Sequence, residues 1–123
     1  MKNKLKLVLW GKNFQLPKDY NNLEFDNYEF DYSDDFKQRK LFIYKNNKMI
    51  KQIWYWDNGN KNSEYNWKNG KFDGKGYEWY ENGKLSYESN YKNGWSDGKQ
   101  YSWWSGGELY NETYYKDGVK INK

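Results

Sequence analysis

The sequence contains no cysteine and no histidine. These absences exclude disulfide bonds, thiol nucleophiles and the usual zinc sites, and they remove imidazole as a general base, metal ligand or pH switch. A pair of carboxylates could still serve a glycosidase, but nothing in the pattern singles out two of the 17 acidic residues. We therefore expect no catalytic residues, no metal site and no cofactor, and we interpret the chain as non-enzymatic.

Alanine is also absent, and Pro17 is the only proline. The 123 residues include 8 Trp, 14 Tyr and 6 Phe, together with 11 Gly and many Asn. A chain that lacks the strongest helix former, but is rich in aromatic and turn residues, is typical of β-structure. Each buried aromatic ring removes about 150 to 250 Å² from water, so aromatic packing can replace an aliphatic core. The composition predicts one small all-β domain.

What the chain does have is a repeat with a period of 24 residues. The step is kept by three glycines and three glutamates: Gly59, Gly83, Gly107, Glu64, Glu88 and Glu112. A fixed period of this length indicates one supersecondary unit stacked on copies of itself. Within each period, strand-like runs are separated by Asn-Gly or Asp-Gly, which supply the positive φ angles that two-residue hairpin loops require. The unit is therefore predicted to be a β-hairpin.

The clear copies span about residues 53–76, 77–100 and 101–123, and Leu41 to Trp56 looks like a degenerate hairpin one residue out of phase. Upstream of Leu41 the repeat is no longer recognisable. We predict a single-domain meander of stacked antiparallel hairpins over 41–123, preceded by a non-repeating N-terminal β cap over 1–40.

Within the predicted cap, residues 23–32 alternate as a half-buried strand does. Tyr28, Phe30 and Tyr32 fall on one side of this strand, and Glu29 and Asp31 fall on the other. The aromatic side is expected to face the interior of the protein.

Two stretches of the repeat carry a family resemblance. Tyr87 to Gly98 and Glu64 to Gly76 resemble MORN repeats, and the run from Tyr80 to Leu85 resembles the bacterial variant found in YwqK-type antitoxin or immunity proteins. The match covers about residues 53–118, and it departs from the pattern where Gln100 replaces a glycine and Gly106 replaces the turn asparagine. The resemblance implies a hairpin scaffold that serves as an interaction module.

The net charge of +4 conceals an acidic block. Residues 19–35 contain seven acids and no base, whereas residues 1–18 contain five lysines and no acid. Such a block is often only a solvated face, but it can also present a negative patch that steers a basic partner. The residues that we assign to a partner-binding acidic patch are Glu24, Asp26, Glu29, Asp31, Asp34 and Asp35.

A second candidate surface consists of side chains that recur with the repeat. Stacked hairpins would align Glu64, Glu88 and Glu112 as a ladder of carboxylates, which either receives cations from a partner or pairs with Lys and Tyr inside the sheet. Trp56, Tyr80 and Trp104 form an aromatic column of the same kind. Rings fall on both faces of the predicted sheet, and an exposed aromatic stripe usually marks a binding surface.

We interpret the protein as an antitoxin or immunity-type inhibitor that occludes a basic toxin or nuclease by direct binding. A phage-encoded inhibitor of a bacterial defence enzyme would use the same surface. A choline- or carbohydrate-binding array of aromatic hairpins is an alternative from another class.

Arg39 is the only arginine among the 21 basic residues, which argues against direct nucleic-acid binding. The apolar stretch near Met1 is interrupted by Lys6 and is too short for a signal peptide or a membrane span. We therefore predict a cytoplasmic protein that does not bind membranes.

Overall fold

The computed structural model describes residues 20, 22–33 and 38–122. Asp34 and Asp35 of the predicted acidic patch lie outside these ranges, and so do residues 1–19 of the predicted cap.

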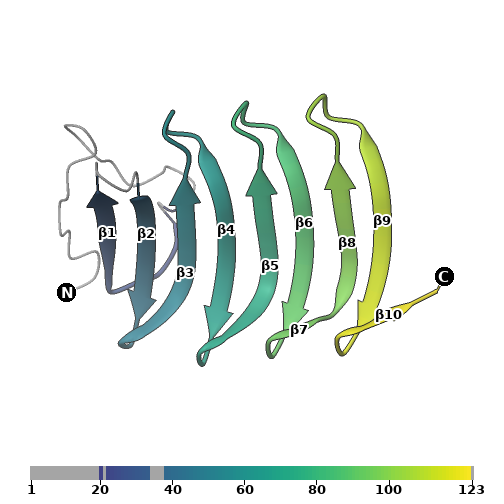
Figure 1. Ribbon diagram of the computed structural model, residues 1–123. Helices are drawn as coiled ribbons and strands as arrows, with labels where there is room; N and C mark the ends of the chain where they lie inside the picture. The colour runs from purple at the N-terminus through teal and green to yellow at the C-terminus, as the bar shows by residue number, and fades with distance from the viewer. Residues whose placement is uncertain (1–19, 21, 34–37, 123) are drawn as a thin grey trace.

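The described residues form one antiparallel sheet in which each hairpin lies beside the next (Figure 1). Its order is β1-β2-β3-β4-β5-β6-β8-β9-β10, with the short β7 paired to β6. The bounds are β1 Asn27–Ser33, β2 Gln38–Lys45, β3 Lys48–Tyr55, β4 Lys61–Lys68, β5 Lys71–Trp79, β6 Leu85–Lys92, β7 Trp95–Ser96, β8 Gly98–Trp103, β9 Leu109–Lys116 and β10 Val119–Ile121. The predicted all-β meander of hairpins is confirmed.

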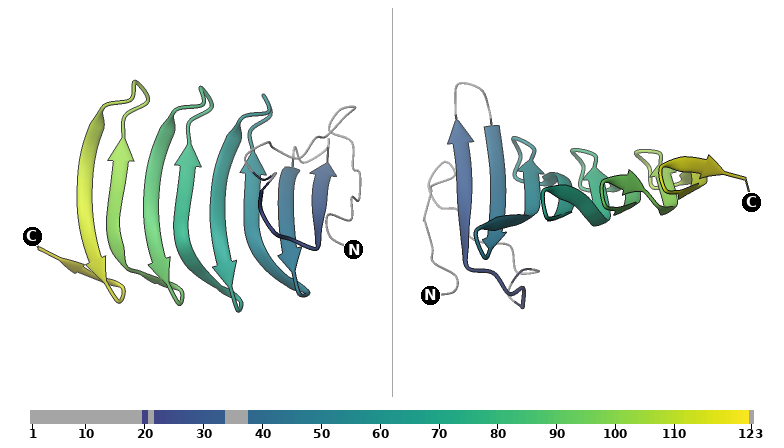
Figure 2. Two further views of the ribbon diagram at one scale, coloured as in Figure 1. Left: turned by 180° about the vertical axis from the view of Figure 1, so that it is seen from behind. Right: turned by 90° about the horizontal axis from the view of Figure 1, so that it is seen from below.

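The sheet is strongly twisted between its N-terminal strands and the repeats. Seen from below, β1 and β2 appear lengthwise, whereas the later strands are seen nearly end-on (Figure 2). This follows from the right-handed twist of each strand, which accumulates from strand to strand. The N-terminal pair therefore crosses the direction of the array.

The hairpins turn at two opposite edges of the sheet, which we call upper and lower as they lie in Figure 1. Each lower turn is a two-residue loop with left-handed backbone angles, for example Asn69 (φ 51°) and Gly70 (φ 80°). Asparagine and glycine tolerate such angles, which explains why they recur there. The upper turns after β3, β5 and β8 are longer, and each is closed by hydrogen bonds such as that from the Tyr80 N–H to the Lys84 carbonyl (2.9 Å).

Cross-strand pairing divides the side chains between two faces. One row of paired residues crosses eight strands and consists of Phe30, Leu41, Ile53, Glu64, Tyr77, Glu88, Tyr101 and Glu112. Directly paired residues lie on the same face of a sheet. We call the face that carries this row the core face, and the other the outer face.

The hydrophobic core lies on the core face at the N-terminal end. Its buried members are Tyr20, Phe25, Tyr28, Phe30, Leu41, Ile43, Ile53 and Tyr55. The predicted inward orientation of Tyr28 and Phe30 is confirmed, because they are 3% and 2% exposed. Tyr20 and Phe25 precede β1 and complete the cluster. Burying an aliphatic or aromatic side chain of this size contributes roughly 1.5 to 3 kcal/mol, so this cluster is a principal source of stability.

On the outer face, one departure from the repeat has a packing reason. Tyr65 lies opposite Gly76, where an added Cβ would come within 2.5 Å of the tyrosine ring. One period later the small and large residues are exchanged, because Ser89 corresponds to Tyr65 and Gln100 corresponds to Gly76. Both are buried. Gln100 can therefore replace a repeat glycine because the ring that would collide with it is also gone.

Candidate protein-binding surfaces

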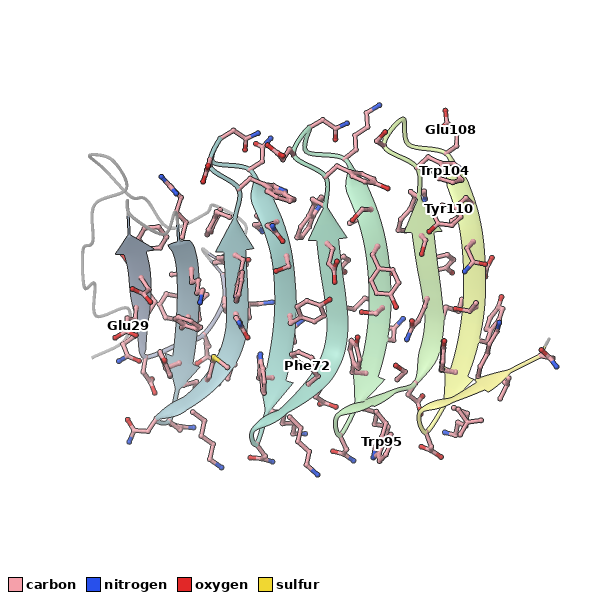
Figure 3. The ribbon with its side chains drawn as sticks, in the orientation of Figure 1. Glu29, Phe72, Trp95, Trp104, Glu108 and Tyr110 are labelled. Carbon is pink, nitrogen blue, oxygen red and sulfur yellow. The ribbon has the colours of Figure 1, made fainter. Side chains whose placement is uncertain are left out.

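The acidic patch predicted around β1 is only partly assembled. Glu29 and Asp31 lie two residues apart in β1 on the outer face, and both are exposed, as is Glu24. Figure 3 shows Glu29 at the N-terminal end of the sheet. Asp26 instead has a structural contact, since its Oδ2 accepts a hydrogen bond from the Asn46 N–H at 2.6 Å. Glu29 and Asp31 are thus the described pair that shares one exposed surface.

The three repeated glutamates do align in the core-face row, with Tyr77 and Tyr101 between them. Strands in a sheet lie about 4.8 Å apart, so carboxylates two strands apart are separated by about 10 Å. Each carboxylate contacts a lysine or a tyrosine of the protein itself. This agrees with the interpretation that the ladder pairs internally, and not with the interpretation that it is left free for the cations of a binding partner.

Glu64 is the buried member of this ladder. Its Oε1 accepts hydrogen bonds from the Tyr20 hydroxyl (2.6 Å) and from Lys61 Nζ (2.8 Å), and its Oε2 lies 3.2 Å from Lys51 Nζ. Burial raises the pKa of Glu64, but the hydrogen bonds and the two positive charges outweigh burial and lower it below its usual value. Glu64 is therefore an ionised part of the fold, covered by Tyr20.

The later two glutamates make fewer contacts. Glu88 Oε2 lies 3.0 Å from Lys75 Nζ, and Glu112 Oε2 accepts a hydrogen bond from the Tyr114 hydroxyl at 2.6 Å. The side chain of Glu88 is half-buried, whereas Glu112 is exposed. Exposure of the ladder therefore increases from the N-terminal to the C-terminal end.

The aromatic column Trp56, Tyr80 and Trp104 links one repeat to the next. Trp56 Nε1 donates to the Trp79 carbonyl (3.0 Å), and the Tyr80 hydroxyl donates to the Trp103 carbonyl (2.6 Å). Both contacts tie an upper turn to the strand end of the following repeat. For Trp104, the described chain provides no following repeat, and this ring stacks on Tyr110 at a centroid distance of 4.3 Å.

A cluster of exposed apolar side chains lies at the C-terminal end of the sheet. We define the C-terminal apolar cluster as Trp104, Leu109, Tyr110, Val119 and Ile121, which are between 41% and 65% exposed. Trp104 and Tyr110 lie together at the upper end of β8 and β9 (Figure 3). Of these five residues, only Trp104 was predicted from the sequence as a binding residue. The others belong to the C-terminal copy of the repeat, where β10 is the last strand in the order of the described sheet.

The core face also carries two similar ring pairs one period apart. Tyr77 with Trp79, and Tyr101 with Trp103, each have centroids 5.7 Å apart and interplanar angles of 28° and 31°. All four rings are half-buried. Rings therefore lie on both faces of the sheet, as expected from the sequence.

No protein-family model matches the chain. No curated protein matches it either. Among solved structures, the chain is similar to the glycosylation-associated protein (Gap123) complex from Streptococcus agalactiae, with 22% identity, a TM-score of 0.48, and coverage of 76% of this chain and 18% of the other.

A second similar structure is that of accessory secretory proteins 1, 2 and 3 from Streptococcus pneumoniae. Here the identity is 19%, the TM-score is 0.48, and coverage is 90% of this chain and 20% of the other. The chain thus spans about a fifth of the chains that it matches. At these values neither likeness carries an argument about function.

Among the described residues, no helix has the length and apolar character needed to cross a membrane. The carboxylates of this part of the chain also form no group of three or more that could hold a metal ion.

Proposed function

We propose that this protein is a non-enzymatic protein-binding module, and that the C-terminal apolar cluster is its main contact surface. The observation that supports this proposal is the concentration of exposed apolar side chains at one end of the sheet. Six of the seven exposed large hydrophobic residues of the described chain lie between Trp95 and Ile121. Trp104, Leu109 and Tyr110 lie at the upper edge of this end, and Val119 and Ile121 lie on β10 at the lower edge. Exposed apolar side chains gathered at one end of a protein often mark an interaction site.

The chemistry of the cluster suits a protein partner. Trp and Tyr are enriched among residues that dominate binding energy, because they bury a large area and still offer a polar atom. The stacked Trp104 and Tyr110 hold each other in place, which reduces the entropy lost on binding. Glu112 is exposed two residues after Tyr110 in the same strand, β9, and supplies a charge beside the cluster.

The more specific proposal is an inhibitor of the antitoxin or immunity type, built on a MORN-like scaffold and acting in the cytoplasm on a basic toxin or nuclease. It is supported by the resemblance of the repeats and by the exposed carboxylates of Glu29 and Asp31. These charges lie at the opposite end of the sheet from Trp104, so their role would be to steer the partner.

The test is affinity purification from host cells with matched baits. The Trp104→Ser/Tyr110→Ser double variant should lose a partner that the wild type and a Trp54→Ser control both retain. Trp54 is 40% exposed but lies outside the cluster. Thermal unfolding of each bait checks that it is folded. Retention of the same partners by the double variant would contradict the assigned surface.

The recovered partner then tests the inhibitor proposal. We expect the purified protein to abolish the partner's toxic or nuclease activity at a stoichiometric ratio. Glu29→Lys/Asp31→Lys should slow association, and the difference from wild type should shrink as salt is raised. A partner whose activity is unchanged on binding would leave the binding module intact and reject the inhibitor role.

The two ring pairs on the core face support carbohydrate binding as a second candidate. The two pairs lie on β5 and β8, which are two strands and thus about 10 Å apart, and each pair could stack on a sugar ring. Oligosaccharide titration monitored by Trp fluorescence distinguishes this function, because Trp79→Phe and Trp103→Phe should each weaken the response. Unchanged fluorescence across β-linked and α-linked oligosaccharides would exclude it.

A further inference from the structure

The four lower turns of the sheet have the same backbone form but different hydrogen-bond partners. They are Asn46–Asn47, Asn69–Gly70, Asn93–Gly94 and Asp117–Gly118. The hydrogen bonds between the two strands of a hairpin do not involve the N–H groups of its two loop residues. Each turn therefore has two N–H donors that can bind an acceptor. Successive N–H groups of this kind form concave anion receptors in many proteins.

Three of these turns receive a carboxylate from an earlier part of the chain. The contacts are Asn46 N–H to Asp26 Oδ2 (2.6 Å), Asn93 N–H to Asp73 Oδ1 (3.3 Å) and Asp117 N–H to Asp97 Oδ2 (3.4 Å). In the last two turns the second N–H is also used, since Gly94 donates to the Phe72 carbonyl and Gly118 to the Ser96 carbonyl. A carboxylate at the turn is therefore a regular feature of this edge.

The remaining turn, Asn69–Gly70, makes neither contact within the part of the chain that the structure describes. The reason is local sequence. Asp73 and Asp97 are each followed by a glycine with a left-handed angle, Gly74 (φ 94°) or Gly98 (φ 109°), at an irregularity in the strand. The corresponding start of β3 contains Met49 and Ile50, and its bulge is one residue shorter. The apolar residues Met49 and Ile50 thus occupy the positions at which the next two repeats have an aspartate followed by a glycine.

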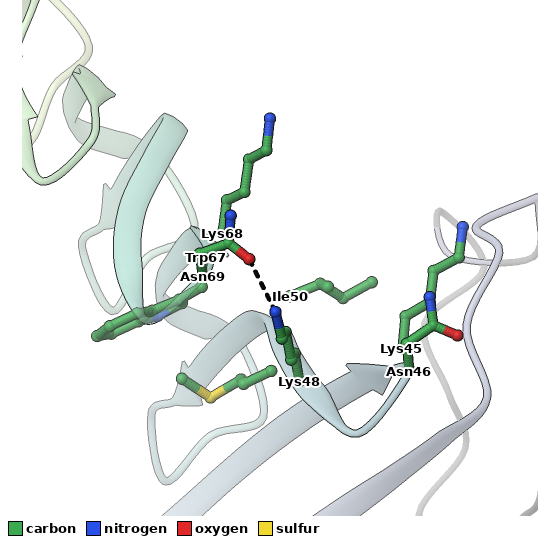
Figure 4. A pocket seen from close by; sticks show the side chains of 8 residues that line it. Lys45, Asn46, Lys48, Ile50, Trp67, Lys68 and Asn69 are labelled. Atoms are coloured by element: carbon green, nitrogen blue, oxygen red, sulfur yellow. Dashed lines mark hydrogen bonds between the residues drawn. The ribbon is translucent and has the colours of Figure 1, made fainter.

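A pocket of about 390 Å³ lies at this place (Figure 4). Its lining consists of Lys45, Asn46, Lys48, Met49, Ile50, Trp67, Lys68 and Asn69. Lys48 Nζ is held by a hydrogen bond to Asn69 Oδ1 (3.0 Å), and Trp67 Nε1 donates to Gln52 Oε1 (3.2 Å). The indole ring and Met49 are half-buried and provide an apolar wall, whereas Ile50 packs against the hydrophobic core.

The charged residues that line the pocket are all lysines, and a carboxylate, that of Asp26, lies beside it on the Asn46 N–H. No acidic residue is among the lining residues. Among the described residues, no carboxylate forms an ion pair with Lys45, Lys48 or Lys68, whereas Lys51, Lys61 and Lys75 on the core face are all paired. Three ammonium groups that form no ion pair with the described carboxylates, beside turn N–H groups that have no acceptor in the described ranges, create a local preference for an anion.

We propose that this pocket binds a carboxylate carried on an apolar group. The carboxylate takes the place that the Asp73 side chain has at the next turn, accepting from the Asn69 N–H while the lysines neutralise it. The apolar carrier packs on Trp67 and Met49. A carboxylate is favoured over a phosphate because the sheet places that group at the three other turns. This site is separate from the C-terminal apolar cluster and does not depend on the proposed function.

Amide NMR of the full-length protein tests the site directly. Titration with phenylacetate should shift the Asn69 and Gly70 amide signals in a saturable way and alter Trp67 fluorescence. The Asn93 and Gly94 amides, which already have acceptors, serve as internal controls and should not move. Acetate, which lacks the ring, and benzyl alcohol, which lacks the charge, should each bind at least about tenfold more weakly. Equal shifts at both turns, or none, would overturn the proposal.

Lysine variants distinguish a specific binding site from non-specific electrostatic attraction. The Lys45→Gln/Lys68→Gln double variant should weaken phenylacetate binding about tenfold, which corresponds to about 1.4 kcal/mol. Lys92→Gln is the matched control, because Lys92 is the equivalent of Lys68 one period later and is also exposed. It should change the affinity by less than about twofold. A similar loss in both variants would indicate non-specific attraction and reject the site.

Asp73→Ala provides the converse test. Removing this carboxylate exposes the Asn93 N–H, so the Asn93 signal should begin to respond to phenylacetate.

Two further probes, phenyl phosphate and the peptide acetyl-Phe-Asp-amide, distinguish the possible sources of the anion. Tighter binding of the peptide assigns the carboxylate to a protein side chain, and tighter binding of phenylacetate assigns it to a small organic acid. A phenyl phosphate that binds more tightly than both would overturn the assignment of a carboxylate.

Discussion

The N-terminal strands and the repeats of this sheet are stabilised in different ways. All eight buried hydrophobic residues of the described chain lie between Tyr20 and Tyr55, where residues ahead of β1 cover the core face. From β4 onward both faces consist of half-exposed rings and polar side chains, and buried positions such as Ser89 and Gln100 are polar. One end is a small layered core, and the other is a single sheet held by hydrogen bonds and ring contacts between neighbours.

The comparison shows that the same repeated residue can have different roles along the array. Glu64 is buried under Tyr20, whereas Glu112 is exposed; Trp56 donates to the following repeat, whereas Trp104 is 57% exposed. In a stacked repeat each unit contacts only its neighbours, so the units at the two ends have different surroundings from the inner ones. The exposure of these repeated side chains is the observation on which the proposed binding surface rests.

The largest expected difference between the two regions concerns aliphatic truncation. Leu41 is fully buried, so Leu41→Ala should lower the free energy of unfolding by about 2 to 5 kcal/mol through lost burial and the cavity left behind. Leu109 is 50% exposed, and Leu109→Ala should cost about 0.5 kcal/mol or less. Urea denaturation followed by circular dichroism measures both. Similar losses would mean that the two ends share one cooperative core.

A smaller effect is expected within the glutamate ladder. Glu64→Gln removes the charge that Lys61 and Lys51 surround, and at pH 7 it should cost about 1 to 3 kcal/mol. Glu112→Gln, at an exposed site, should cost a few tenths of a kcal/mol.

The effect of Glu64 also has a defined pH dependence. The folded pKa of Glu64 is lowered, so its stabilisation is fully present above the unfolded pKa and is lost as pH falls through the folded pKa. The gap between wild type and Glu64→Gln should therefore shrink as the pH falls below the range in which an unfolded Glu titrates, near about 4.3, and close below the lowered folded pKa. Denaturation midpoints across this range provide the measurement, and a constant gap would contradict the role of the charge.

The smallest effect concerns the hydrogen bonds that join one repeat to the next. Tyr80→Phe removes the bond to the Trp103 carbonyl and should cost about 0.5 to 1.5 kcal/mol. Tyr110→Phe removes a hydroxyl from a residue that is 53% exposed and should be close to neutral. Native-state hydrogen exchange reports both changes, because loss of the link should speed exchange mainly in β8 and β9. Uniform changes along the sheet would show that the link is not local.

Much of the fold follows from the sequence pattern. The 24-residue period, the Asn-Gly and Asp-Gly turns and the alternating strand around Phe30 predict the hairpins and their order. The ladder of glutamates also follows, because a constant step in sequence places equivalent residues in one row. These features depend on local backbone preference and on periodicity, which are properties of neighbouring residues.

The candidate sites are less accessible from sequence. Asp26 belongs to the acidic block by composition, yet its carboxylate binds the Asn46 turn, 20 residues further along the chain. The lysine-lined pocket arises because the bulge of β3 is one residue shorter than its counterpart. The sequence shows the phase shift, but not that no carboxylate of the described ranges reaches the Asn69–Gly70 turn.

The sequence by itself determined the repeating unit of this protein, its turns and the row to which each side chain belongs. Only the tertiary structure decided which members of a row are covered, paired or exposed. The physical reason is that strand and turn formation depend on residues close in the chain, whereas burial depends on segments that are distant in sequence. Tyr20 covers Glu64 across 44 residues, and Glu112 has no such cover among the described residues.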